Sequence, residues 1–304
     1  MTPHERRSLL SGLGFTSLWI IGLGVFTAYP VVASLYYSFC DYSILKSPVW
    51  IGLENYGQLV SDDLFWKSLG NTLFFAALAV PLGTIASLGL AVLLNQEVRG
   101  KAFFRVVFYL PSIVPLIAAS MLWMWIFNGQ YGLLNYALAP LLKPFGLEAP
   151  LWLADPAWAK PALVIMSLWG TGNAMVIYLA GLQSVPRELY EAAAIDGAGA
   201  WGKFWHVTLP MLAPVIYFNV TMALIGALQV FAQAWVLSQA TGAEGADGSP
   251  ARSTLFYTVY LFSTAFFNLR MGYASAMAYV LFIVIASLTW LGTRLSRNQV
   301  EATQ

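Results

Sequence analysis

The sequence predicts an all-α integral membrane protein with six transmembrane helices. Of its 304 residues, 59% are apolar and only 10% are charged, whereas a soluble domain carries about 25% charged residues. Six stretches without an ionisable side chain are long enough to cross a bilayer, which takes about 20 helical residues. They cover residues 8–39, 68–96, 106–142, 161–186, 207–243 and 271–293. The net charge of +1 gives no indication of nucleic-acid binding.

From these stretches, the six helices are expected at about residues 9–39, 71–94, 104–127, 161–183, 211–237 and 272–293, the third of which begins two residues before its stretch. Charged residues precede the first apolar run, as in a signal peptide. That run continues too long and lacks a small-residue cleavage site, so we expect a retained first helix. An outer loop at residues 128–160 follows the third span, and its Trp152 and Trp158 are expected at the membrane interface.

Helix-breaking residues lie inside three of the expected spans. They are Pro81 in the second, Pro111 and Pro115 in the third, and Gly-Thr-Gly-Asn at residues 170–173 in the fourth. Backbone groups freed by such residues cannot face lipid, so they need other helices or a wet cavity as partners. Two interpretations stay open: kinked packing helices, or helices that line a translocation path.

The distribution of basic residues predicts the orientation. The N-terminus, the second and fourth connections and the C-terminus hold nine bases and six acids, and the remaining segments hold six bases and eight acids. By the positive-inside rule, both termini lie in the cytoplasm. The nine bases are Arg6, Arg7, Arg99, Lys101, Arg105, Arg187, Lys203, Arg294 and Arg297.

A polar segment at residues 184–210 separates the fourth and fifth spans. It reads Glu191-Ala192-Ala193, three residues, Gly197, nine residues, then Val-Thr-Leu-Pro up to Pro210. A proline at residue 186 favours a helix start, and Gly197 suits a left-handed helix end. We therefore expect a short helix at residues 187–195, with alanines that could fit a partner's cleft. A second short helix at 200–207 would lead to Pro210 at the start of the fifth span.

This spacing resembles the EAA loop of bacterial ABC importer permeases. Wider features resemble the carbohydrate-uptake branch, the maltose-transporter type: Ile-Gly-Leu-Glu-Asn-Tyr at 51–56, Gly-Leu-Gln-Ser-Val-Pro at 181–186 and Asp-Gly-Ala at 196–198. The resemblance implies a type I importer permease fold, with one permease domain at 1–304 and a core region at 71–293. The family often carries a Thr-x-Gly-Gly-Pro turn after the fifth span. Here Thr-Gly-Ala at 241–243 and a longer insert replace that turn. The resemblance therefore does not extend to this part of the expected outer contact with a binding protein.

The resemblance also implies the partners. They are a second homologous permease, two ATP-hydrolysing subunits, an extracytoplasmic solute-binding protein, the lipid bilayer and a sugar. ATP and magnesium would bind the partner subunits, so this chain would be neither an enzyme nor a cofactor-binding protein. The location implied is the cytoplasmic membrane of a bacterium or archaeon. The coupling residues carried over to this sequence are Glu191 as charged anchor, Ala192 and Ala193 as packing surface and Gly197 as turn, with Asp196, Leu209 and Pro210.

Residues 197–203 also fit a dinucleotide fingerprint and most of a P-loop. Both motifs need a strand before them and a helix after them, whereas here a helix precedes. Phe204 also stands where a P-loop has its magnesium-binding Ser or Thr, so no nucleotide site is expected. With His4 and His206 as the only histidines and Cys40 as the only cysteine, neither a metal site nor a disulfide is expected.

Neutral polar residues recur in the fourth and fifth spans at helical spacing. Amide groups suit sugar hydroxyls, and an aromatic ring suits the apolar face of a sugar. The resemblance points to the helix before the EAA loop, at Trp169, Gly170 and Asn173, and the pattern adds residues of the fifth span. The candidate substrate-path residues are Trp169, Gly170, Asn173, Asn219, Gly226, Gln229 and Gln233. The alternative is that these amides form hydrogen bonds between helices.

The predicted function is therefore a permease subunit of an ATP-driven, binding-protein-dependent importer for a sugar or oligosaccharide. One alternative is the same importer class for glycerol phosphate, a polyol or a polyamine, although a phosphate would favour a basic residue in the path. Another is an ion-coupled transporter, which usually needs ionisable side chains inside its spans. All six expected spans lack the carboxylates and histidines that such a transporter would use. Which sugar is carried stays open, because selectivity in this class resides largely in the binding protein.

Overall fold

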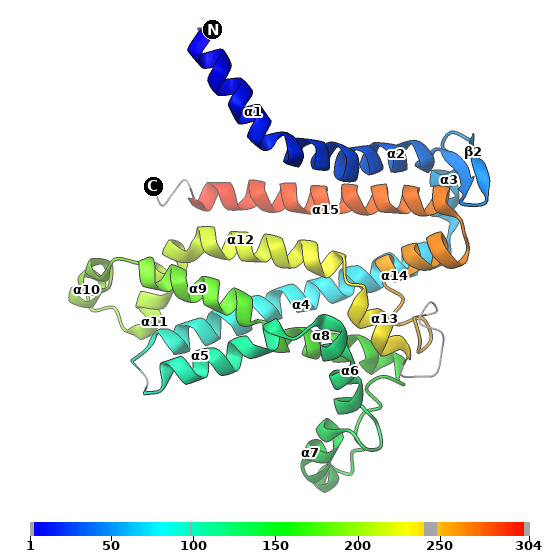
Figure 1. Ribbon diagram of the computed structural model, residues 1–304. Coiled ribbons are helices and arrows are strands. Elements are labelled where there is room, and N and C mark those ends of the chain that lie inside the picture. The colour runs from blue at the N-terminus through cyan, green and yellow to red at the C-terminus, as the bar shows by residue number, and fades with distance from the viewer. Residues whose placement is uncertain (1–2, 98, 240–247, 301–304) are drawn as a thin grey trace. The chain divides into compact units, whose positions relative to one another are not determined.

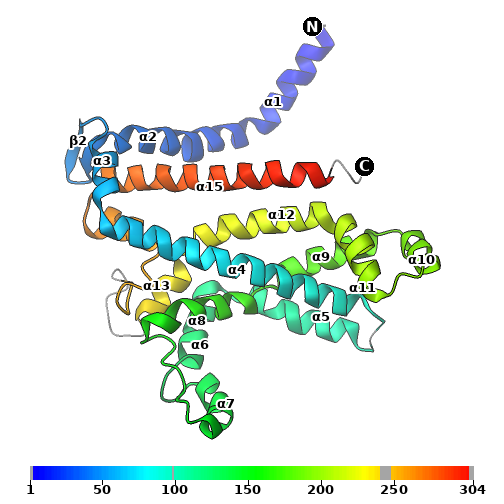
Figure 2. The same cartoon turned by 180° about the vertical axis from the view of Figure 1, so that it is seen from behind.

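The computed structural model describes residues 3–97, 99–239 and 248–300, with backbone only for residues 3–11 and 295–300. The replaced turn expected after the fifth span lies outside the described residues. The chain forms two compact units, residues 1–62 with 261–283 and residues 63–260 with 284–304. Helices make up most of both units (Figures 1 and 2).

The first unit begins with a long apolar helix. Helix α1 (Pro3–Leu23) continues through the π-helical turn η1 (Gly24–Ala28) into α2 (Tyr29–Ser38). A two-stranded antiparallel hairpin, β1 (Cys40–Ser43) and β2 (Lys46–Trp50), and helix α3 (Glu54–Ser61) follow. The π-helical turn η7 (Ser263–Phe267) and the first part of α15 (Met271–Val300) complete the unit. The hairpin was not predicted from the sequence.

The motif at residues 51–56 connects the end of α2 to the hairpin. Asn55 is buried, and its side-chain amide donates to the carbonyl oxygens of Ser38 and Cys40, both at 2.9 Å. The Tyr56 hydroxyl lies 2.9 Å from the Ser38 hydroxyl. Gly52 has a φ of 65°, which a glycine adopts without the steric cost that other residues incur. In this unit the motif therefore has a structural role.

The second unit is built around the 33-residue helix α4, which packs against α8, α9 and α12. Helices α14 and α15 each pass from one unit into the other. The elements of this unit are α4 (Asp63–Asn95), α5 (Lys101–Tyr109), η2 (Leu110–Ile113), α6 (Leu116–Ile126), α7 (Leu133–Leu142), η3 (Lys143–Phe145), α8 (Pro156–Trp169), α9 (Gly172–Ser184), α10 (Arg187–Ile195), α11 (Ala200–Lys203), η4 (Phe204–Thr208), α12 (Leu209–Leu228), α13 (Ala232–Ser238) and α14 (Tyr257–Phe262).

The described helices provide six candidate membrane spans. Four are uninterrupted: Gly12–Ser38, Asp63–Asn95, Ala200–Leu228 and Met271–Arg294. Two more are bent pairs. The pair α5–η2 and α6 bends by 100°, and the pair α8 and α9 bends by 48°. The mostly helical fold with six spans agrees with the prediction when each bent pair counts as one span.

Three details of the spans differ from the prediction. The third span, expected as one helix at 104–127 that its prolines could kink, is instead divided by a 100° bend where Pro115 precedes α6, because proline lacks the N–H that a continuing helix needs. The fifth span, expected at 211–237, is broken: α12 ends at Leu228 and α13 starts at Ala232. Pro81, by contrast, lies inside the unbroken helix α4.

Two hydrophobic clusters form the core of the second unit. The first includes Phe75, Phe127, Trp152 and Phe256. Trp152, expected at the membrane interface, is buried inside the protein in this cluster, where its indole N–H donates to the Asn135 amide oxygen at 2.7 Å. The second cluster, called the inner cluster below, joins α4, α9 and α12. It consists of Leu88, Ala91, Leu94, Met175, Tyr178, Leu179, Leu182 and Leu212.

Candidate functional site

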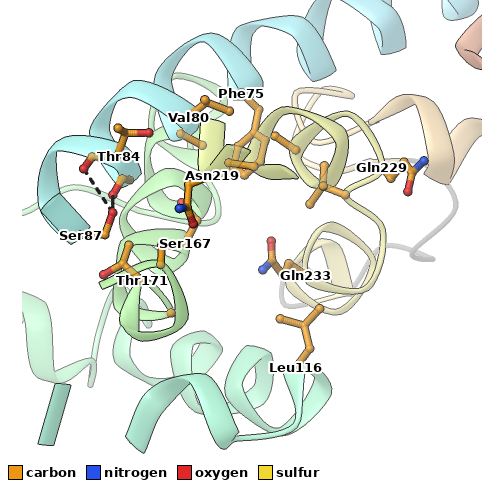
Figure 3. Close-up of a pocket in the computed structure, with 18 of the residues that line it drawn as sticks. Phe75, Val80, Thr84, Ser87, Leu116, Ser167, Thr171, Asn219, Gln229 and Gln233 are labelled. Atoms are coloured by element: carbon orange, nitrogen blue, oxygen red, sulfur yellow. Dashed lines mark hydrogen bonds between the residues drawn. The ribbon is translucent and has the colours of Figure 1, made fainter. Parts of the chain in front are cut away.

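A cavity of about 530 Å³ lies inside the second unit (Figure 3). Helices α4, α8, α9 and α12 line it, together with the α12–α13 break and Leu116 of α6. Both core clusters contribute to its wall: Phe75 and Val80 belong to the first and Tyr178 to the inner cluster. The polar lining residues are Thr84, Ser87, Ser167, Thr171, Tyr178, Asn219, Gln229 and Gln233.

The lining of the cavity is neutral and can form hydrogen bonds. Among the residues that the structure describes, no Lys, Arg, His, Asp or Glu lines it. The hydroxyls of Ser87 and Ser167 each donate to a carbonyl of their own helix, at 2.6 and 2.7 Å, and the Thr171 hydroxyl donates to the Leu168 carbonyl near the end of α8 at 2.9 Å. Their oxygens keep lone pairs with which they can accept hydrogen bonds. Asn219 donates to the Val215 carbonyl at 2.9 Å, so its amide oxygen can also accept a hydrogen bond.

Two helix breaks border this cavity. Gly170 and Thr171 separate α8 from α9, and residues 229–231 separate α12 from α13. At the second break, the Val230 carbonyl accepts a hydrogen bond from the Thr258 hydroxyl. Irregular backbone at membrane depth is tolerated where protein buries it or where it lines a wet cavity. Both breaks therefore occur where their freed polar groups can meet a polar ligand.

Five of the seven candidate path residues line the cavity: Gly170, Asn219, Gly226, Gln229 and Gln233. Figure 3 shows the Gln233 side chain pointing from its helix into the open centre of the cavity. The other two, Trp169 and Asn173, lie outside the lining. The Trp169 ring packs against Trp123, with ring centroids 6.0 Å apart, and Asn173 is exposed on α9.

The break between α8 and α9 explains this difference. The helical spacing used for the fourth span assumed one continuous helix, whereas α9 restarts after the 48° bend. Thr171, Ala174 and Tyr178 line the cavity instead. Sequence reasoning also missed Thr84 and Ser87 of α4. Their spacing of three, following Val80, is a helical stripe that could have indicated a lining face.

The loop between α9 and α12 has the predicted local geometry. Helix α10 covers Arg187–Ile195, and Gly197 has a φ of 81°. The Gly197 N–H donates to the Ala194 carbonyl at 3.1 Å, and the Ala198 N–H to the Ala193 carbonyl at 2.8 Å. This pair of bonds is the Schellman helix end, which favours glycine at the left-handed position. The predicted short helix and its glycine end are confirmed.

Helix α10 is presented almost entirely at the surface. No residue of it is buried, and Ile195 just before the turn is 88% exposed. Of the candidate coupling residues, Glu191, Ala192, Asp196 and Gly197 are exposed, whereas Ala193 and the start of α12, Leu209 and Pro210, are half-buried. The Tyr190 hydroxyl lies 3.0 Å from the Thr208 hydroxyl and connects α10 to η4.

The loop joins two helices that line the cavity. The second short helix expected at 200–207 is α11 followed by η4, which continues directly into α12. Near the loop, α9 and α12 approach closely, because a Cβ atom added at Gly181 would lie 2.8 Å from the Leu212 side chain. Leu209 packs against the inner cluster. Displacement of the loop would therefore reach both helices.

Comparison with curated proteins gives relatives that match over nearly their whole length. The chain is 39% identical to the probable ABC transporter permease protein YesP of Bacillus subtilis, over 93% of this chain and 89% of that protein. It is 35% identical to the lactose transport system permease LacF of Rhizobium radiobacter, over 96% and 97%. It is 34% identical to the trehalose/maltose transport system permease MalF of Thermococcus litoralis, over 90% and 89%.

The fold also matches a solved structure. A chain of a bacterial ABC transporter involved in importing the acidic polysaccharide alginate superposes with a TM-score of 0.79, over 96% of both chains, at 23% identity. Residues 79–300 match the profile of the family described as the binding-protein-dependent transport system inner membrane component. The chain therefore belongs to this family of ABC transporter permeases, which are inner-membrane transport subunits.

Proposed function

We propose that this permease carries a neutral sugar or oligosaccharide across the cytoplasmic membrane through the described cavity. The observation that carries this proposal is the lining itself, in which hydroxyl and amide groups lie beside Phe75 and Phe231 without a charged residue. Hydrogen-bonding groups can replace water around sugar hydroxyls, while aromatic rings contact the apolar face. A volume of about 530 Å³ is within the range of small-molecule sites.

The relatives support the same substrate class, since two of them are named for lactose and for trehalose and maltose. Glycerol phosphate or a polyamine is less favoured by this cavity, because each would gain from an opposite charge in the lining. The described lining residues include no such charge. The uncharged lining likewise gives no support to proton or sodium coupling, which usually uses intramembrane ionisable groups.

The energy would come from ATP hydrolysed, with magnesium, on two partner subunits, one of which would dock on α10. Glu191 would be the charged anchor and Ala192 and Ala193 the packing surface, with Asp196 and Gly197 shaping the turn. Support comes from the exposure of α10 and from its continuity with α12. In this arrangement both termini and the loop face the cytoplasm, and a second permease completes the path. A solute-binding protein delivers the sugar from outside. The single permease domain would span residues 1–304, with its core at 71–293.

The test is uptake by the assembled transporter. The chain is purified with its partner permease, ATPase and binding protein and reconstituted in proteoliposomes. Uptake of labelled lactose, maltose and trehalose is measured, with spermidine and glycerol 3-phosphate for comparison. We expect ATP-dependent and binding-protein-dependent accumulation of at least one of the three sugars. Accumulation of a charged solute and of none of the sugars would contradict the proposal.

A further inference from the structure

Tyr178 lies where the cavity ends and the inner cluster begins. It lines the cavity and also packs among the leucines of the inner cluster. That cluster contains residues of α4, α9 and α12 and contacts Leu209 and Phe204 of the loop segment. It therefore separates the cavity from the loop and forms what we call the floor of the cavity. Within the cluster, Tyr178 carries the only hydroxyl.

The hydroxyl of Tyr178 is buried and unpaired. The residue is 0% exposed, and its oxygen has no hydrogen-bond partner among the described residues. The Thr84 side chain lies beside it, but no hydrogen bond joins the two hydroxyls in the geometry of this structure. A buried hydroxyl without a partner is unfavourable, because it has lost its water without a replacement. A phenylalanine at this position would fill the same space without that cost.

The residues on the cavity side of Tyr178 indicate which kind of ligand could form a hydrogen bond with its hydroxyl. Thr84 and Ser87 lie in the same part of α4, and Ser87 already donates to its own helix. A neutral sugar that reaches the floor would bring hydroxyls that both donate and accept. A phenol can do the same. The hydrogen-bonding capacity of Tyr178 is thus available to a ligand that passes this point.

We propose that Tyr178 is a substrate-recognition residue, whose hydroxyl pairs with one sugar hydroxyl when the floor loosens to let the sugar pass. The inference rests on the proposed function, since it requires the cavity to be the sugar path. It adds a residue to that path and a specificity: the transporter distinguishes a sugar from its analogue lacking that hydroxyl. The hydroxyl is covered in this structure, so recognition occurs during passage and not in the resting cavity.

The test compares Tyr178→Phe with the wild type in the full reconstituted transporter. The probes are whichever of lactose, maltose and trehalose the wild type transports, and its monodeoxy analogues, taken one hydroxyl at a time. Maximal uptake rates are measured with saturating binding protein and sugar. For one analogue, the wild type should prefer the parent sugar by about tenfold, the value of one hydrogen bond. Tyr178→Phe should bring that ratio close to one and leave the ratios for other positions unchanged.

Tyr217→Phe is the matched control, because the Tyr217 hydroxyl bonds to Thr293 at 2.6 Å and does not line the cavity. It should keep every ratio. The midpoint of thermal unfolding gives a second readout: Tyr178→Phe should unfold at the same or a higher temperature. Unchanged deoxy ratios would overturn the inference while leaving the proposed function intact. A lower unfolding temperature, or failure to assemble, would reveal a structural partner for the hydroxyl and would also overturn it. No uptake of any sugar by the wild type would contradict the proposed function itself.

Discussion

The backbone angle of Gly197 explains why a glycine follows the exposed helix α10. Its φ of 81° completes the Schellman end of α10, and an added Cβ atom would meet nothing within 4 Å. The requirement for glycine is therefore conformational and not a matter of space. A left-handed conformation costs an alanine roughly 1 kcal/mol, and asparagine tolerates it better.

We predict that Gly197→Ala shifts the equilibrium constant for forming the native turn about fivefold toward other conformations and lowers uptake, that Gly197→Asn has a smaller effect and that Gly197→Val has a larger one. The measurement is ATP-driven uptake at equal amounts of assembled transporter. Gly199→Ala is the control, since Gly199 has an ordinary φ of −69° and equally open surroundings. Equal uptake by the Gly197→Val and Gly199→Ala variants would contradict this account of the turn.

Helix breaks were the least predictable features at the scale of elements. Hydropathy predicted where the spans lie, because burial in lipid depends on composition. It did not predict that Pro81 leaves α4 intact while Pro115 accompanies a 100° bend. Nor did it predict the α12–α13 break at Gln229 to Phe231, which contains neither proline nor glycine. Such breaks depend on which polar partners the neighbouring helices supply, and that information is tertiary.

The same limit explains which of the candidate path residues line the cavity and which do not. The spacing of Asn219, Gly226, Gln229 and Gln233 identified a lining face because most of them share helix α12 or its end. Trp169 and Asn173 were placed on one face across a break, so the helical register did not hold between them. The loop turn at Gly197 was predictable, because a Schellman end is encoded within a few neighbouring residues.

Gly226 provides a prediction for the α12 element. A Cβ atom added there would meet nothing within 4 Å, and the residue lines the cavity. Gly226→Leu should fill cavity volume and lower uptake by about tenfold or more. Replacing a helical glycine raises helix propensity by about 1 kcal/mol, so the unfolding temperature should not fall. Gly226→Ala should retain most of the uptake.

Gly89→Leu is the control for the leucine variant. Gly89 is also in a helix with open space around it, but it is exposed on α4 and outside the cavity lining. It should transport like the wild type. If Gly226→Leu transports as fast as Gly89→Leu, the cavity is not the path of the substrate.

At the scale of the whole molecule, the helix proposed to dock the ATPase and the cavity proposed to pass the substrate are separate parts of the chain. Helix α10 is exposed and carries no buried residue, whereas the cavity lies between helices that the loop connects. The inner cluster, with Leu209 packed on it, lies between the two. The choice of sugar could not be predicted from this sequence, because in this class of importer a separate protein delivers the substrate.

Glu191→Lys tests whether force enters through this loop. The exposed carboxylate is proposed to pair with a basic residue of an ATPase subunit, so lysine would place two positive charges together at that contact. Disrupting an interfacial charge pair in this way costs several kcal/mol, and uptake should fall by at least about tenfold. Because no residue of α10 is buried, the variant should insert in the membrane and unfold at the wild-type temperature.

The control is Glu148→Lys, which changes an exposed acid in the loop between α7 and α8 and should keep full uptake. Binding-protein-stimulated ATP hydrolysis should fall with uptake in the Glu191→Lys variant, and wild-type values of both would show that the motor does not engage the chain through this residue.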